Sequence, residues 1–134
     1  MKTFDGKGVT LGRIASHVAK EALKGFEVNV VNCDQVIITG NRKTTEREFS
    51  EKRSRFGHSQ KGPKHPATSE KIVKRAIRGM LPNFREGRGR VAFKKVRCYV
   101  GIPKELSEAT ITTIAAAKKI KFNKVSEFTK KGAQ

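Results

Sequence analysis

The sequence lacks long apolar runs and closely spaced cysteines, and it contains little acidic charge. No stretch of about 18 apolar residues occurs, so no segment is predicted to cross a bilayer. The first residues contain no apolar core of the kind found in signal peptides. Cys33 and Cys98 lie far apart without a CxxC spacing, which favours two ordinary packed thiols in a reducing, intracellular compartment. We expect one domain, because 134 residues can bury a core without disulfides or metal ions.

Acidic residues number 12 against 30 lysines and arginines, which gives a formal net charge of +18. A surplus of this size destabilises a compact chain unless a polyanion neutralises it. The composition therefore favours a nucleic-acid partner over an anionic membrane surface or a small-molecule substrate. A helix that lies on a membrane would need bulky aromatic residues beside its basic ones, and we find no such helix.

The positive charge is concentrated in the middle of the chain. Residues 1–41 hold 5 basic and 4 acidic side chains, residues 42–97 hold 18 and 5, and residues 98–134 hold 7 and 3. We therefore divide the single domain, residues 1–134, into three parts. These are a nearly neutral scaffold at 1–41, a basic middle segment at 42–97, and a last strand with a C-terminal tail at 98–134.

The scaffold has the pattern of a strand, a helix and a second strand. A short strand is predicted at 2–5, and apolar residues then recur at helical spacing over 11–23. A β-branched strand follows at 28–32, which predicts a right-handed βαβ unit. A further strand at 36–39 comes too soon after it for a parallel crossover, so its pairing stays open.

The basic middle segment alternates helical patterns with loops. A polar helix is indicated at 45–55, and a loop rich in glycine, proline and histidine at 57–66. An amphipathic helix is predicted from Ser69, as its cap, to the residues before Pro82. The remaining predicted elements are a short helix at 91–95, a strand at 96–100 and a last helical turn within 126–131.

Three glycines between the first strand and helix raise the alternative of a small nucleotide-dependent enzyme built on the βαβ unit. In a dinucleotide-binding fingerprint the third glycine would stand at Leu11, whereas here Gly12 comes one residue late. We interpret Gly6, Gly8 and Gly12 as a turn that allows tight packing of helix on sheet. Residues 40–45 also lack the glycine and lysine order of a phosphate loop.

No pattern of metal ligands or catalytic residues is evident. His17, His58 and His65 share no helical face and have no cysteine partners at zinc-site spacing. The acids at 46, 48 and 51 stand among lysines and arginines, as on a solvated helix. We therefore predict no metal, no cofactor and no catalysis.

The basic middle segment is the candidate functional site. Arginine predominates over 75–90, and its planar guanidinium can grip phosphate with two hydrogen bonds. Glycines at 57, 62, 87 and 89 are expected to let backbone approach phosphates. The DNA-binding patterns of helix-turn-helix, zinc finger and basic zipper are missing, which favours folded RNA. The candidate contacts are Arg42, Lys43, Arg47, Arg53, Arg55, Lys61, Lys64, Arg75, Arg78, Arg85, Arg88, Arg90, Lys94 and Lys95.

Five short motifs in order resemble a known family. They are Leu-Gly-Arg-Ile-Ala-Ser at 11–16, Val-Ile-Ile-Thr-Gly-Asn-Arg at 36–42, Gly-Pro at 62–63 with Arg-Gly-Met-Leu-Pro at 78–82, the segment 89–95, and Tyr-Val-Gly-Ile-Pro at 99–103. Together they resemble the universal large-subunit ribosomal protein family number thirteen, in its archaeal and eukaryotic branch. The resemblance covers residues 3–103, whereas 50–60 and 115–119 have no clear counterpart.

The resemblance implies a three-layer α/β/α domain around a central four-stranded, mainly parallel sheet. It implies a structural constituent of the large ribosomal subunit that binds and stabilises folded large-subunit rRNA. The expected partners are this rRNA and neighbouring ribosomal proteins, in the cytoplasm, with no membrane, cofactor, enzymatic activity or small-molecule substrate.

Overall fold

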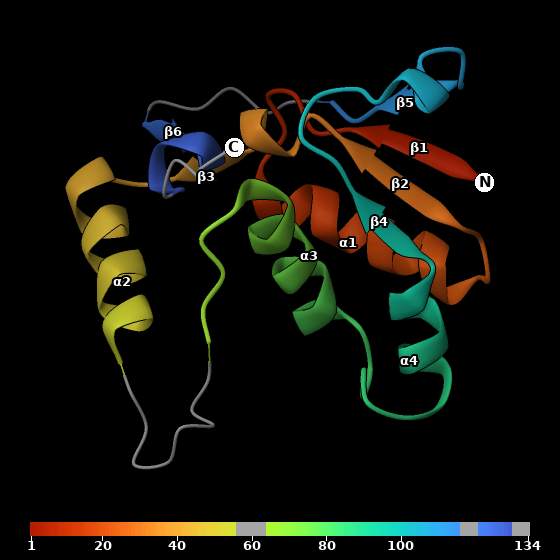
Figure 1. Cartoon of the computed structure of the whole chain (residues 1–134), viewed down its shortest axis with the longest axis horizontal. Coiled ribbons are helices and arrows are strands. Elements are labelled where there is room, and N and C mark those ends of the chain that lie inside the picture. Colours follow the sequence, from red (N-terminus) through yellow and green to blue (C-terminus); the bar gives the residue numbers. More distant parts are fainter. Residues whose placement is uncertain (56–63, 116–120, 130–134) are drawn as a thin grey trace.

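The computed structural model describes residues 1–55, 64–115 and 121–129, and it contains a central parallel sheet (Figure 1). The strands are β1 (Lys2–Asp5), β2 (Val28–Val31), β4 (Val96–Cys98) and β5 (Ile111–Thr113). Their order is β4-β2-β1-β5, and every neighbouring pair is parallel. The predicted three-layer α/β/α class with a four-stranded sheet is confirmed. Strand β5 was not predicted from the sequence, because its three residues show no alternation of apolar and polar side chains.

The βαβ scaffold forms as predicted. Helix α1 (Leu11–Leu23) joins β1 to β2 and buries Ile14, Val18 and its alanines. Gly25 follows the helix with φ +97°, a left-handed conformation that glycine adopts without strain. Arg13, His17 and Lys20 lie exposed on the opposite face, so the face of α1 that packs into the core is apolar.

The strand with the open pairing belongs to a second, smaller sheet. Strand β3 (Ile37–Thr39) pairs antiparallel with β6 (Phe122–Lys124), a strand from the tail. The tail therefore folds back onto the start of the basic middle segment. The 3-10 helices η1 (Cys33–Gln35), η2 (Lys104–Leu106) and η3 (Val125–Phe128) complete the connections, and the helical turn expected within 126–131 corresponds to η3.

Three helices carry the basic middle segment: α2 (Arg42–Ser54), α3 (Ser69–Met80) and α4 (Gly87–Lys94). Each begins differently from the prediction. Asn41 caps α2 by accepting a hydrogen bond from the Lys43 backbone N–H, so the helix starts three residues early. The cap position of α3 is Thr68, and α4 already includes the glycines at 87 and 89.

Helix α3 packs its apolar face against α1 beneath the sheet. Ile72, Val73 and Ile77 are buried in one cluster with Ile14 and Val18 of α1. Figure 1 shows α1, α3 and α4 gathered together, with the η2 turn across the strands from α3 and α4. This shared core attaches the basic middle segment to the scaffold.

The expectation that Gly6, Gly8 and Gly12 allow tight packing of helix on sheet is partly wrong. A Cβ at Gly12 would meet nothing within 4 Å, so this residue does not serve close packing. The close approach is at Gly6, where a Cβ would lie 2.7 Å from Val36 Cγ2 and 3.0 Å from two backbone oxygens. Gly89 likewise packs closely against the 82–83 backbone: a Cβ there would clash with the Pro82 carbonyl oxygen and lie 2.6 Å from the Asn83 carbonyl oxygen, so this glycine does not leave room for a phosphate.

We predict that Gly6→Ala lowers the free energy of unfolding by about 1–3 kcal/mol, because the new methyl group would clash with Val36 and two fixed carbonyls. Chemical denaturation of the two proteins measures the difference. The matched control is Gly12→Ala, which lies in a helix with open space and should leave stability unchanged or slightly raised. Equal losses in both variants would contradict this account of the turn.

Candidate nucleic-acid interface

The polar face of α3 is a row of four cations. Lys71, Lys74, Arg75 and Arg78 follow the i, i+3, i+4, i+7 spacing that places side chains on one side of a helix. The opposite face of the same helix is buried against α1. The amphipathic pattern therefore fixes these cations on the outer surface of the domain.

Two phenylalanines hold some of the cations in place. The Arg78 guanidinium lies 4.5 Å and the Arg85 guanidinium 5.6 Å from the centre of the Phe84 ring. The Lys74 ammonium lies 5.2 Å from the centre of Phe93, which meets Phe84 edge to face at 6.3 Å. Cation–π contacts of this kind stabilise a positive group without neutralising it.

A cavity of about 230 Å³ opens beside this cluster. We call it the α3–α4 pocket, and its lining is Lys64, Pro66, Lys71, Lys74, Arg75, Arg78 and Phe93. Arg75 Nη1 donates to the Lys64 carbonyl oxygen at 2.9 Å and so ties the segment before α3 to the helix. Burial, followed by the charge of Arg78, lowers the pKa of Arg75, which shows how closely the cations are crowded.

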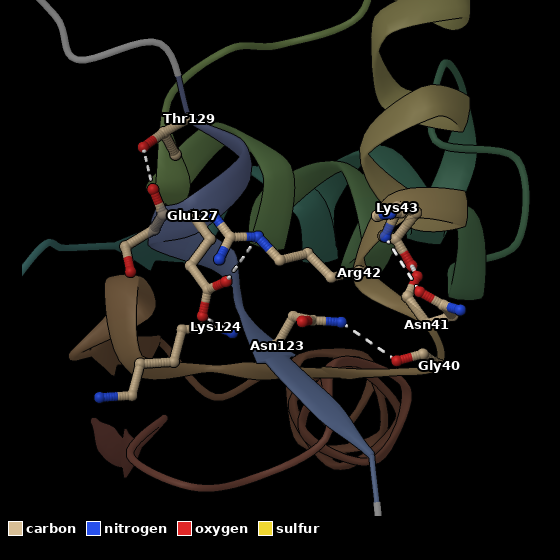
Figure 2. Close-up of polar contacts among 10 residues, drawn as sticks. Gly40, Asn41, Arg42, Lys43, Asn123, Lys124, Glu127 and Thr129 are labelled. Carbon is tan, nitrogen blue, oxygen red and sulfur yellow. Dashed lines mark hydrogen bonds and ion pairs between the residues drawn. The ribbon is translucent and has the colours of Figure 1, made fainter.

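A second group of candidate residues lies on α2. Arg42, Lys43 and Arg47 occupy its first turns and are exposed. In Figure 2 the Arg42 side chain points toward Glu127 of η3, with Nε 3.5 Å from Oε2. The Asn123 amide of β6 donates to the Gly40 carbonyl oxygen at 3.1 Å, so the start of α2 is anchored to the tail.

Helix α2 buries no residue completely, and its one large apolar side chain, Phe49, packs against the core and stacks on an aromatic ring of η3. Phe49 lies parallel to Phe128 with ring centres 5.5 Å apart and an interplanar angle of 3°. Arg53 reinforces the contact by donating to the Phe128 carbonyl oxygen at 2.6 Å and to the Pro66 carbonyl oxygen at 3.3 Å. The guanidinium of Arg53 is therefore engaged within the protein, and burial lowers its pKa.

The other predicted contacts are dispersed. Arg55 at the end of α2 and Arg88, Arg90 and Lys94 of α4 are exposed, and Lys61 lies outside the described residues. Lys95 Nζ donates to the Gly25 carbonyl oxygen at 2.8 Å, which links α4 to the turn after α1. The structure thus brings Lys64, Arg75, Arg78 and Arg85 together, and it places the other described candidates along α2 and α4.

Sequence reasoning missed Lys52, Lys71, Lys74, Phe84 and Phe93. Lys71 and Lys74 share the helical spacing of Arg75 and Arg78, so the periodicity of α3 contained the signal for them. Lys52 points with Arg75 and His65 into a smaller apolar cavity of about 210 Å³ between α2 and α3. Nothing in the local sequence indicated a role for Phe84 and Phe93, because that role arises only where the 82–86 loop packs against α4.

Positive charge is compensated on the scaffold but not on α3 or α4. Hydrogen bonds from Lys2 and then Lys24 lower the pKa of Glu21 to about 2, so this carboxylate stays ionised between them. In the described part of the chain the ion pairs are Lys2–Glu21, Lys24–Glu21, Arg42–Glu127 and Arg47–Glu51. None of them involves a cation of α3 or α4. These cations form a basic surface without an acidic partner among residues 1–55, 64–115 and 121–129.

Other chemistry is poorly supported. Over the described residues, no three histidine, cysteine or acidic side chains gather as metal ligands would, and no helix is long and apolar enough to cross a membrane. Cys33 is buried, and a hydrogen bond with Cys98 together with burial raises its pKa, so the thiol stays protonated. This is the ordinary packing role expected for the cysteines.

We predict that Phe49→Ala loosens α2 without unfolding the domain, because Phe49 is the one large apolar side chain of this helix and packs against both Phe128 and the core. Hydrogen exchange resolved by peptide should speed up across α2 and stay unchanged in α1 and α3. The matched control is Phe26→Ala, an exposed aromatic outside this contact. Unchanged protection of α2 in Phe49→Ala would show that the helix is held by something else.

We further predict that Arg75→Gln raises the pKa of His65. Burial, then Arg75, and then three cations at the C-terminal end of α2 lower this pKa, so removal of the charge with the largest effect should reverse part of the shift. An NMR titration of the imidazole protons measures the change, with Lys20→Gln on the far face of α1 as control. A pKa of His65 that is the same in both variants would contradict the convergence of α2 and α3.

The comparisons with known proteins agree with this architecture. Residues 1–105 match the family described as Ribosomal protein L13. The large ribosomal subunit protein uL13 of Methanosarcina barkeri is 44% identical over 118 residues, which cover 87% of this chain and 83% of the relative. The uL13 of Methanocaldococcus jannaschii is 44% identical over 110 residues, with 80% of each chain covered.

A third relative, the uL13 of Archaeoglobus fulgidus, is 37% identical over 125 residues, which cover 93% of this chain and 79% of the relative. These relatives are ribosomal proteins and not enzymes, so the alternative of a nucleotide-dependent enzyme is set aside. The match spans the scaffold, the basic middle segment and the start of the tail. The chain belongs to the ribosomal protein L13 family.

Proposed function

We propose that this protein is a structural constituent of the large ribosomal subunit and binds folded large-subunit rRNA through its basic middle segment. The relatives are named as large-subunit proteins, which supports assembly of this protein into the large ribosomal subunit. The observation that carries the proposal is the row of cations on α3, whose positive charge no carboxylate of the described residues neutralises.

Phosphate is the ligand that suits this surface. Arg78 and Arg85 present planar donors held on the Phe84 ring, and such preorganised groups lose less entropy when they bind an anion. The exposed cations of α2 and α4 extend the surface on either side of α3. A surface spread over three helices fits the shape and backbone of a folded RNA better than a free nucleotide.

The described surface leaves room for protein neighbours as well. Val100, Ile102 and Phe122 are exposed apolar side chains outside the α3 cluster. We propose that neighbouring large-subunit proteins are the further partners, in the cytoplasm, and that no small-molecule substrate is involved.

We predict that Lys64→Gln, Arg78→Gln and Arg85→Gln together weaken rRNA binding and flatten its salt dependence. Each phosphate contact releases bound counterions, so the loss of three contacts should reduce the slope of log affinity against log salt by about 2–3 units. The measurement is filter binding to a large-subunit rRNA fragment over a salt series.

The matched control is the triple variant Lys7→Gln, Lys20→Gln and Lys104→Gln, which removes the same charge from exposed sites outside the basic middle segment. Its slope should change by well under one unit. Equal losses of slope in the two variants would show that net charge alone, and no particular face, carries the binding.

A further inference from the structure

The α3–α4 pocket differs from the rest of the basic surface because it is concave and has an aromatic wall. Five of its seven lining residues are lysine or arginine, and the ring of Phe93 forms part of the remainder. Phe93 is half-buried, so part of the ring faces the pocket while part packs beneath α3. Cations alone would suit any phosphate, but an aromatic ring beside them suits a base as well.

The size of the pocket restricts its occupant. Its volume of about 230 Å³ lies below the range of about 300–1,000 Å³ that is usual for free small-molecule ligands. It is therefore too small to enclose a free dinucleotide, yet it can take part of one nucleotide while the rest of a strand stays outside. A paired base cannot reach Phe93, because in an A-form duplex the bases lie inside the helix.

We propose that the α3–α4 pocket receives one unpaired nucleotide of the bound RNA, with its base against Phe93 and its phosphate among the cations of α3. The proposal rests on the proposed rRNA-binding function and names a feature of the RNA that this site selects. Stacking on an aromatic ring tolerates any base, so the pocket selects an unpaired nucleotide rather than a sequence.

The contacts within the pocket fit this division of roles. Arg75 is fixed by its bond to the Lys64 carbonyl oxygen, and Arg78 by the Phe84 ring, so both hold their positions before RNA binds. Lys74 lies over Phe93 in the free protein and occupies the place of the base. Its flexible stem allows the ammonium to move to the phosphate when a base takes the ring.

The experiment compares a blunt RNA duplex with the same duplex carrying one bulged uridine, both bound to the full-length protein at fixed salt. The wild-type protein should bind the bulged duplex about tenfold more tightly, as one stacked base implies. Phe93→Leu should abolish this preference, so that the ratio of the affinities for the bulged and the blunt duplex falls to about one. The matched control is Phe26→Leu, which changes an exposed aromatic that also lies beside a lysine but is outside the pocket, and the preference of this variant should remain.

A second measurement needs no variant and so does not depend on the folding of Phe93→Leu. A photoreactive 5-iodouridine at the bulge should crosslink to the wild-type protein at Phe93 or at another residue that lines the α3–α4 pocket. Equal binding of the two duplexes, or a crosslink outside the lining of the pocket, would overturn this inference while leaving the rRNA-binding proposal intact. Failure to bind either RNA would overturn both.

Discussion

The packing of α3 against α1 is the contact on which the basic surface depends. Ile72, Val73 and Ile77 are buried with the apolar residues of α1, so the helix cannot rotate without exposing its core face. Full burial of one such side chain stabilises the folded state by about 1.5–3 kcal/mol. Because the cations occupy the other side of the same helix, the hydrophobic contact that stabilises the fold also sets the direction of the charge.

Crowded cations destabilise a helix by mutual repulsion. On α3 this repulsion is offset without ion pairs to acidic side chains of the described residues. Phe84 and Phe93 offer the negative faces of their rings, and the Lys64 carbonyl oxygen accepts from Arg75. Carboxylates would have relieved the same repulsion, as Glu21 does between Lys2 and Lys24. They would also have cancelled the positive charge on which the proposed RNA binding depends.

Much of the scaffold could be predicted because its signals are local. The apolar spacing of α1 and α3 and the β-branched run of β2 each specify their element within a few residues. Strands β5 and β6 have three residues each, and only their partners β1 and β3 define them. The partner of β3 could not be predicted from the sequence either, because β6 lies more than eighty residues later, in the tail.

The candidate site was predictable in composition but not in arrangement. Charge counting located the basic middle segment, yet it could not tell that Arg53 turns inward to two carbonyl oxygens or that Lys95 braces the turn after α1. Glycine spacing pointed equally to Gly6, Gly8 and Gly12, whereas of these three only Gly6 makes a close approach, because which glycine meets a neighbour depends on how strands and helices cross. Concavity is also a product of packing, so the pocket beside Phe93 could only be seen in three dimensions.

The two halves of the basic surface are held with unequal strength, and this difference bears on recognition. The cations of α3 stand on a helix that buries several side chains in the core, whereas those of α2 stand on a helix attached by the single apolar side chain of Phe49 and a few polar contacts. A fixed array of donors discriminates between RNA shapes, because a misplaced phosphate cannot draw the donors toward it. A loosely attached helix instead adapts to its partner at an entropic cost. Shape selection should therefore reside in α3 and the pocket beside it, and α2 should add affinity once the RNA is seated there.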